Sequence, residues 1–128
     1  TSDDLKAGFE QHRAETEVHV ERLEKGFELL GKAPRGKTWD AILGIIEEGK
    51  EIMDEFKGTQ ALDAGLVSAA QAVEHYEMAR YGTLATWAKQ LGHTEALELF
   101  LATLKEEEAT DEKLTKLAKT AVNLKAAA

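Results

Sequence analysis

The chain of 128 residues contains no cysteine, which excludes disulfide bonds, thiolate metal ligands and cysteine nucleophiles. It has a single proline, so few positions force a helix to end. No apolar run approaches the roughly 20 residues that cross a membrane, and no signal peptide is visible. The net charge of −8 argues against a nucleic-acid or anionic-membrane partner, whereas it suits the binding of cations.

Several catalytic motifs are also missing. Ser2 and Ser68 are the only serines, and neither lies in a nucleophile elbow. The sequence has no phosphate-binding glycine loop, no dinucleotide-binding fingerprint and no HExxH motif. A hydrolase or a nucleotide-dependent enzyme is therefore not expected.

Helix-forming residues dominate what is present. The chain is 43% hydrophobic and 31% charged, which is enough apolar material for a core. Alanine, leucine, glutamate and lysine are abundant, and no segment alternates like a strand. We predict one all-α domain over residues 1–128.

Apolar residues at spacings of three and four predict four helices. The first runs from about residue 2 to 31, begins at a capping Ser2 and ends at Gly31. Three more helices are expected over about 38–57, 60–91 and 94–124, with Thr38 and Thr59 as caps. Long helices joined by short connections predict an antiparallel bundle of three long helices and one shorter helix.

The long helices carry polar residues on faces that a bundle should bury. The stripe of the last helix is Leu97, Leu101, Leu104, Glu107, Asp111, Leu114, Ala118 and Ala121. Glu77 lies on the stripe of the third helix, one turn after Glu74. His12 and Val20 lie on the stripe of the first helix, with Glu15 and His19 at its edge. A buried carboxylate must be protonated, paired or bound to metal, because burying it alone costs several kcal/mol.

Carboxylates and imidazoles that converge from different helices favour a dinuclear iron or manganese site. Hard divalent metals take oxygen ligands and imidazole, and ferritin-type bundles supply them from facing helices. No Glu-x-x-His pair of the usual kind occurs. The helical-face argument favours Glu15, Glu77, Glu107 and Asp111 as ligands.

A competing interpretation is a non-catalytic helical protein that acts by binding a protein partner. Its buried acids would be paired with lysine, histidine or Arg80, which lies three residues after Glu77. Trp87 is expected to be a core or interface anchor, and His75 an ordinary hydrogen-bonded helix residue. Six other acids are expected to be solvated: Glu17, Glu21, Glu24, Glu47, Glu51 and Glu106.

The chain resembles the YciE/YciF-type ferritin-like stress proteins of bacteria. The resemblance spans nearly the whole chain and is strongest in VEHYEMARYGTL (73–84) and EEEATDEKLT (106–115), with further similarity in FEQHRAETEVHVERLEKGFELLGK (9–32) and GIIEEGKEI (44–52). It implies a ferritin-like bundle, a homodimer in the bacterial cytoplasm and a link to general stress responses.

The sequence departs from that family in two ways. Family members usually carry one more N-terminal helix with a carboxylate before the position of Ser2. Without it, we expect a metal site that is incomplete, finished by a partner, or complete only in a longer parent chain. KTWDAI (37–42) also lacks a cysteine that relatives often have.

Carried over residue by residue, the resemblance implies a metal-facing set in the helix middles. That set is His12, Glu15, His19, Glu74, Glu77, Glu107 and Asp111. The predicted function is a stress-protective protein with two Fe or Mn ions, which oxidises Fe(II) or reduces peroxide, with Tyr81 donating a hydrogen bond or an electron.

Overall fold

The computed structural model describes residues 2–33 and 40–127, and all regular structure in these ranges is helical. The elements are α1 (Asp3–Leu29), α2 (Asp40–Glu55), α3 (Leu62–Leu91), α4 (Thr94–Leu117), the π-helical turn η1 (Ala118–Val122) and α5 (Asn123–Ala126). The all-α bundle predicted from the periodicity is confirmed, with three long helices and one shorter helix. Thr38, the expected cap of the second helix, lies outside the described residues.

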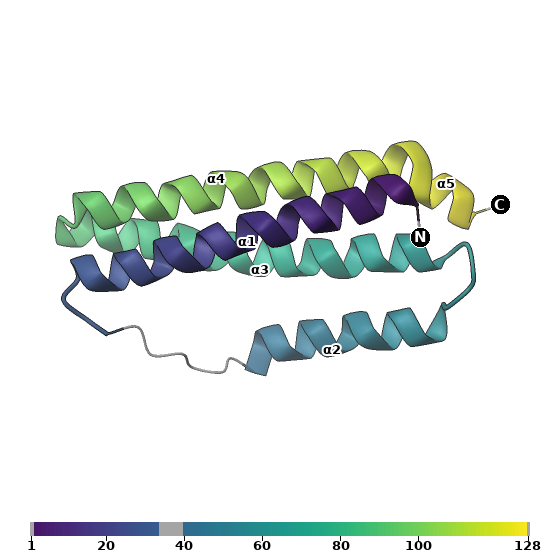
Figure 1. Cartoon of the computed structure of the whole chain (residues 1–128), viewed down its shortest axis with the longest axis horizontal. Helices are drawn as coiled ribbons and strands as arrows, with labels where there is room; N and C mark the ends of the chain where they lie inside the picture. Colours follow the sequence, from purple (N-terminus) through teal and green to yellow (C-terminus); the bar gives the residue numbers. More distant parts are fainter. Residues whose placement is uncertain (1, 34–39, 128) are drawn as a thin grey trace.

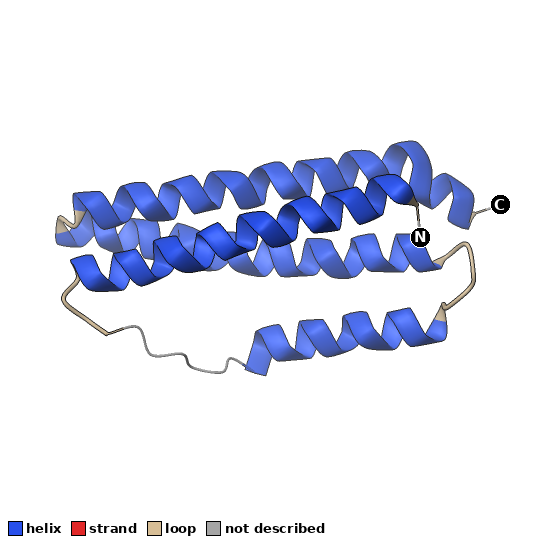
Figure 2. Cartoon of the chain, viewed as in Figure 1, coloured by secondary structure: helices blue, strands red, loops and turns tan. Residues whose placement is uncertain are grey.

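The helices run side by side along the long axis of the molecule (Figures 1 and 2). Helix α3 packs against α4, α1 packs against α4, and α2 packs against α3. The described N- and C-terminal ends lie at the same end of the bundle, so α1 and α4 run in opposite directions (Figure 1). None of the helices in the described ranges is long and apolar enough to cross a membrane.

Specific local contacts fix where the long helices begin and end. The Ser2 hydroxyl accepts a hydrogen bond from the Leu5 amide at 3.2 Å, which confirms it as the cap of α1. The Ser2 amide also donates to Oδ2 of Asp63 at 2.7 Å and so joins the starts of α1 and α3. Gly92 ends α3 with a left-handed φ of 76°, a conformation that glycine adopts without strain.

The expected cap at Thr59 is wrong. Its hydroxyl donates to the carbonyl of Phe56 at 2.8 Å instead. Helix α3 begins three residues later, after Ala61, which makes no side-chain capping bond. The turn that follows α2 therefore uses the threonine to satisfy the carbonyl of a preceding residue.

The buried residues form two apolar clusters separated by a polar layer. One cluster contains Leu5, Val67, Leu114 and Val122, and the other contains Ala85, Ala88, Ala96 and Phe100. The buried polar side chains lie between them along the helices: His19, Glu74, Thr103, Glu107 and Thr110. The apolar clusters therefore hold the helices together at both ends and leave the middle for polar groups.

Four apolar residues lie elsewhere than the sequence pattern predicts. Leu101, which the predicted stripe of the last helix includes, is 46% exposed. Val20 is 52% exposed, and the buried face of α1 instead includes His19. Trp87 is 57% exposed, so it is not a core anchor. The last apolar residue of the bundle core is Val122 rather than Ala121, because the wide turn η1 shifts the helical register by one residue.

Helix α2 depends on a close approach to α3. None of its residues is buried, and a Cβ added at Gly65 of α3 would overlap the Cγ2 of Ile52. The glycine therefore lets the two helices meet, and the outer side of α2 leaves Leu43, Ile46 and Met53 exposed. The homodimer predicted from the sequence is not tested by this arrangement and stays a prediction.

Gly65→Ala is expected to lower the free energy of unfolding by about 1 kcal/mol, because Ile52 is a stiff β-branched residue and overpacking exceeds the gain in helix propensity. Hydrogen exchange should become faster in α2 more than in α1 or α4. Gly44→Ala is the matched control, since an added Cβ there meets nothing within 4 Å. It should stabilise the protein by about 0.5–1 kcal/mol. Equal exchange in α2 in both variants would contradict this account.

Candidate metal centre

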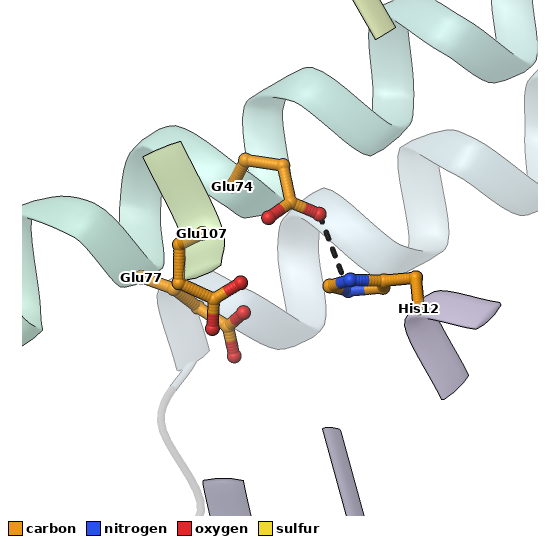
Figure 3. Close-up of side chains that lie close together, drawn as sticks. All are labelled: His12, Glu74, Glu77 and Glu107. Carbon is orange, nitrogen blue, oxygen red and sulfur yellow. Dashed lines mark ion pairs between the residues drawn. The ribbon is translucent and has the colours of Figure 1, made fainter. Parts of the chain in front are cut away.

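Four side chains from three helices converge in the middle of the bundle (Figure 3). His12 of α1, Glu74 and Glu77 of α3 and Glu107 of α4 each offer a ligand atom, and these atoms lie within 4.8 Å of one another. Glu74 and Glu77 share a helix face because they are one turn apart. The four residues all belong to the set that the sequence predicted.

Burial of this group is deep and uneven. Glu74 is 2% exposed and Glu107 is fully buried, whereas His12 and Glu77 are half-buried. Oε1 of Glu74 lies 3.2 Å from Nε2 of His12, the ion pair drawn in Figure 3. Within the described part of the chain, no hydrogen-bond partner meets Nδ1 of His12, Oε2 of Glu74 or either carboxyl oxygen of Glu107.

Buried polar atoms without partners are costly, and most proteins avoid them. Four such atoms in one group therefore need either protons shared between the carboxyl groups or a bound cation. A divalent cation satisfies them directly, since carboxylate oxygens and a neutral imidazole are the ligands that Fe(II) and Mn(II) take. The donor set fits such a metal.

The electrostatics of the group favour the neutral forms in the absence of a cation. Burial raises the pKa of Glu74, a hydrogen bond with the Glu107 carboxyl opposes part of the rise, and the nearby Glu77 carboxylate adds to it. Burial also raises the pKa of Glu107, and the rise is increased by a hydrogen bond from its protonated form to Glu74 and by repulsion from the charges of Glu77 and Glu74. Burial lowers the pKa of His12, so its imidazole is neutral and able to ligate at neutral pH.

His19 connects the group to a surface ion pair. Its Nδ1 lies 3.0 Å from Oε1 of Glu107, although this contact lacks the alignment of a hydrogen bond. Its Nε2 lies 2.8 Å from Oε2 of Glu106. The two guanidinium nitrogens of Arg22 donate to the two Glu106 oxygens at 2.5 and 3.0 Å, which lowers the pKa of Glu106.

The expectation that Glu106 is a solvated surface acid is therefore wrong. Glu106 is half-buried and holds both His19 and Arg22 of the facing helix. Arg22 was not singled out from the sequence. One signal was available, because Arg22 follows His19 by three residues and so shares its face of α1.

The remaining predicted ligands lie beside the group rather than in it. Glu15 is close enough to raise the pKa of Glu74 and accepts a hydrogen bond from Gln11 at 2.7 Å. Oδ1 of Asp111 is 3.0 Å from the donor Nε2 of Gln71 and 3.2 Å from Nε2 of His75.

Tyr81 also lies near the acids of the group. Burial raises the pKa of Tyr81 to about 12, and the charges of Glu77 and Glu107 add to the effect. Its phenol is therefore protonated at neutral pH. The role predicted for it in hydrogen bonding or electron donation stays a prediction.

Fold and site together define a class of protein, an all-α bundle with a buried group of carboxyl and imidazole side chains in its middle. The chain matches the family model described as "Domain of unknown function (DUF892)" over residues 1–127, and it belongs to that family. This match and the similar proteins described next confirm the resemblance to the YciF-type proteins that the sequence showed.

The similar proteins are bacterial. Protein YciF of Escherichia coli (strain K12) is 44% identical over 98% of this chain and 76% of its own length. The crystal structure of the E. coli stress protein YciF has a TM-score of 0.89 and 42% identity, covering 96% of this chain and 78% of that one. The structure of YcfI from Rhodopseudomonas palustris has a TM-score of 0.86 and 44% identity, covering 90% and 73%.

Proposed function

We propose that this protein binds Fe(II) or Mn(II) in the middle of its bundle and serves in protection against stress. The observation that carries the proposal is the set of buried atoms without partners on His12, Glu74 and Glu107. The similarity to a protein described as a stress protein supports the physiological setting.

The side chains have separable tasks in this proposal. His12, Glu74, Glu77 and Glu107 would hold the metal, and their three carboxylates would supply oxygen ligands of the kind that Fe(II) and Mn(II) take. Glu15 lies outside this group, although its charge raises the pKa of Glu74. Glu106, itself paired with Arg22, holds His19 against Glu107, which restricts the orientation of that carboxylate.

When bound, Fe or Mn would supply one-electron chemistry toward oxygen or peroxide. The chain's own contribution is to exclude bulk water from Glu74 and Glu107 and to hold a neutral imidazole opposite them. The homodimer and the cytoplasmic location implied by the resemblance stay part of this proposal. Neither is needed for the roles given to these side chains.

Metal titration of chelator-treated protein tests this proposal. Mn(II) at 100 times its dissociation constant should add about 2.7 kcal/mol to the free energy of unfolding and raise the melting temperature. Elemental analysis should find about two ions per chain when both sites are filled. Glu77→Gln should weaken Mn(II) binding by at least about tenfold, whereas the exposed control Glu108→Gln should leave it unchanged.

The alternative is a helical protein whose buried acids are paired internally. The 3.2 Å contact between His12 and Glu74 is the observation in its favour. Such a core needs no cation, so its melting temperature would not respond to Mn(II), Fe(II) or chelator. A flat response together with no metal in the purified protein would overturn the metal-binding proposal.

A further inference from the structure

A cavity of about 310 Å³ opens between the first turns of α1 and the last turns of α4. In Figure 1 these are the purple start of α1 and the yellow-green end of α4. Its volume lies at the lower end of the range for pockets that bind small organic molecules. We refer to it as the α1–α4 pocket.

The walls of the α1–α4 pocket are mainly apolar. They include Leu5 and Phe9 of α1, Ala70 of α3, and Leu114 and Leu117 of α4. The wide turn η1 adds Thr120 to the outer wall. π-Helical turns inside α-helices frequently occur at functional sites. A wall of this kind suits an apolar body, because water in it would have few partners.

Polar groups mark one end of the pocket. His12 and Glu74 line it, and Nδ1 of His12 and Oε2 of Glu74 are buried and have no hydrogen-bond partner in the described ranges. Glu74 is 2% exposed, so bulk water does not satisfy it. An O–H group that reached this end would donate to the carboxylate oxygen. This end therefore favours a molecule with a hydroxyl over a plain hydrocarbon.

Positive charge marks the other end. Lys113 and Lys116 line the pocket and are exposed, and neither makes an ion pair within the residues that the structure describes. Asp4 is the acid on this part of the lining, so the balance there is positive in a chain whose net charge is −8. The lysines follow Glu107 by six and nine residues, or about 9 and 14 Å along the helix.

We propose that the α1–α4 pocket binds a small amphipathic carboxylate of about ten non-hydrogen atoms. Its anionic group pairs with Lys113 and Lys116, its apolar body lies on the leucine and phenylalanine walls, and its inner hydroxyl meets Glu74 and His12. Binding does not require the metal. Whether the bound carboxylate is also a substrate of the metal site rests on the proposed function. In that case, the proposal names the chemical class of the substrate.

The probe is 4-hydroxyphenylacetate, added to chelator-treated protein and measured by calorimetry and NMR. We expect a dissociation constant of about 1 mM or below for a ligand of this size. Phenylacetate lacks the inner hydroxyl, and 2-(4-hydroxyphenyl)ethanol lacks the charge. Each should bind at least about fivefold more weakly, since each leaves one end of the pocket unpaired.

Two pairs of variants place the molecule in the pocket. The double variant Lys113→Ala and Lys116→Ala should lose the preference for the carboxylate over the alcohol, whereas Lys119→Ala, an exposed lysine outside the lining, should keep it. Gly8 lines the pocket, and a Cβ there meets nothing within 4 Å. Gly8→Leu should therefore fold, fill the space and abolish binding, while Gly44→Leu in α2 should bind normally.

The outcomes separate this proposal from the metal site. Undetectable binding of 4-hydroxyphenylacetate to folded protein, or equal binding after Gly8→Leu, would overturn the pocket even if Mn(II) still binds. Binding of the probe without any response to Mn(II) would keep the pocket and overturn only the metal-binding function.

Discussion

Glu107→Met is expected to make the metal-free protein more stable and to abolish its response to Mn(II). Glu107 is fully buried, and in its ionised form neither of its carboxyl oxygens accepts a hydrogen bond in the described part of the chain. Methionine has a similar length, needs no partner and removes the repulsion from Glu74 and Glu77. Replacing a whole buried ion pair by apolar groups of similar size stabilises some proteins by about 1–4 kcal/mol. Glu107→Met removes only one side of the contact with His19, but His19 keeps its hydrogen bond with Glu106, so the gain should lie at the lower end of that range.

The measurement is thermal unfolding of chelator-treated protein with and without Mn(II). A gain of 1 kcal/mol should raise the melting temperature by about 3–4 °C in a protein of this size. Glu108→Met is the matched control, because Glu108 is the next residue and is exposed. It should change stability by no more than about 0.5 kcal/mol and keep the metal response. A lower melting temperature for Glu107→Met would mean that Glu107 is internally paired, as in the alternative function.

The second large effect is a loss of stability of the metal-free protein at high pH. Burial raises the pKa of Glu74 from 4.5 to about 7 and that of Glu107 to about 9. Between 4.5 and these values, the folded protein binds more protons than the unfolded chain. The free energy of unfolding therefore falls as pH rises. The stability that the two protonated carboxyl groups contribute is fully present below pH 4.5. It is lost as pH rises through their pKa values in the folded protein.

We expect the melting temperature of chelator-treated protein to fall by at least about 5 °C between pH 5 and pH 8.5. His12 opposes this trend weakly near its ordinary value of 6.5, because burial lowers its pKa. Mn(II) replaces the protons on the carboxylates, so the stabilisation that it provides should grow with pH. Glu107→Met should flatten the profile. A melting temperature that rises steadily with pH in the metal-free wild type would contradict the buried, uncompensated acids.

The sequence predicted the helices and placed Glu77 and Glu107 on buried faces, because both features depend on local periodicity. The same argument favoured Glu15 and Asp111, which lie beside the group. His12, Glu74, Glu77 and Glu107 interrupt apolar stripes at mid-helix, and mid-helix residues of an antiparallel bundle meet at one level. The cap at Ser2 was predictable for the same reason, since it involves only the first turn of α1.

Features that depend on how two helices are rotated against each other were not predictable. The pairing of Glu106 with His19 and Arg22 requires the relative orientation of α1 and α4, which one-helix patterns do not contain. The α1–α4 pocket has the same origin. Val122 was missed because the spacing rule assumes 3.6 residues per turn, which η1 does not follow.

That turn also has a consequence for how the family can vary by insertion and deletion. Leu114 and Val122 belong to the same buried cluster although they are eight residues apart, whereas an α-helix returns to nearly the same face after seven. The π-turn absorbs the extra residue. Deleting one residue within 118–122 would restore an ordinary α-helix and keep the later side chains on their faces. Such a deletion would leave the packing of the core unchanged, but it would alter the pocket wall at Thr120. A single-residue indel can therefore alter what the pocket accepts while the bundle that carries it stays the same.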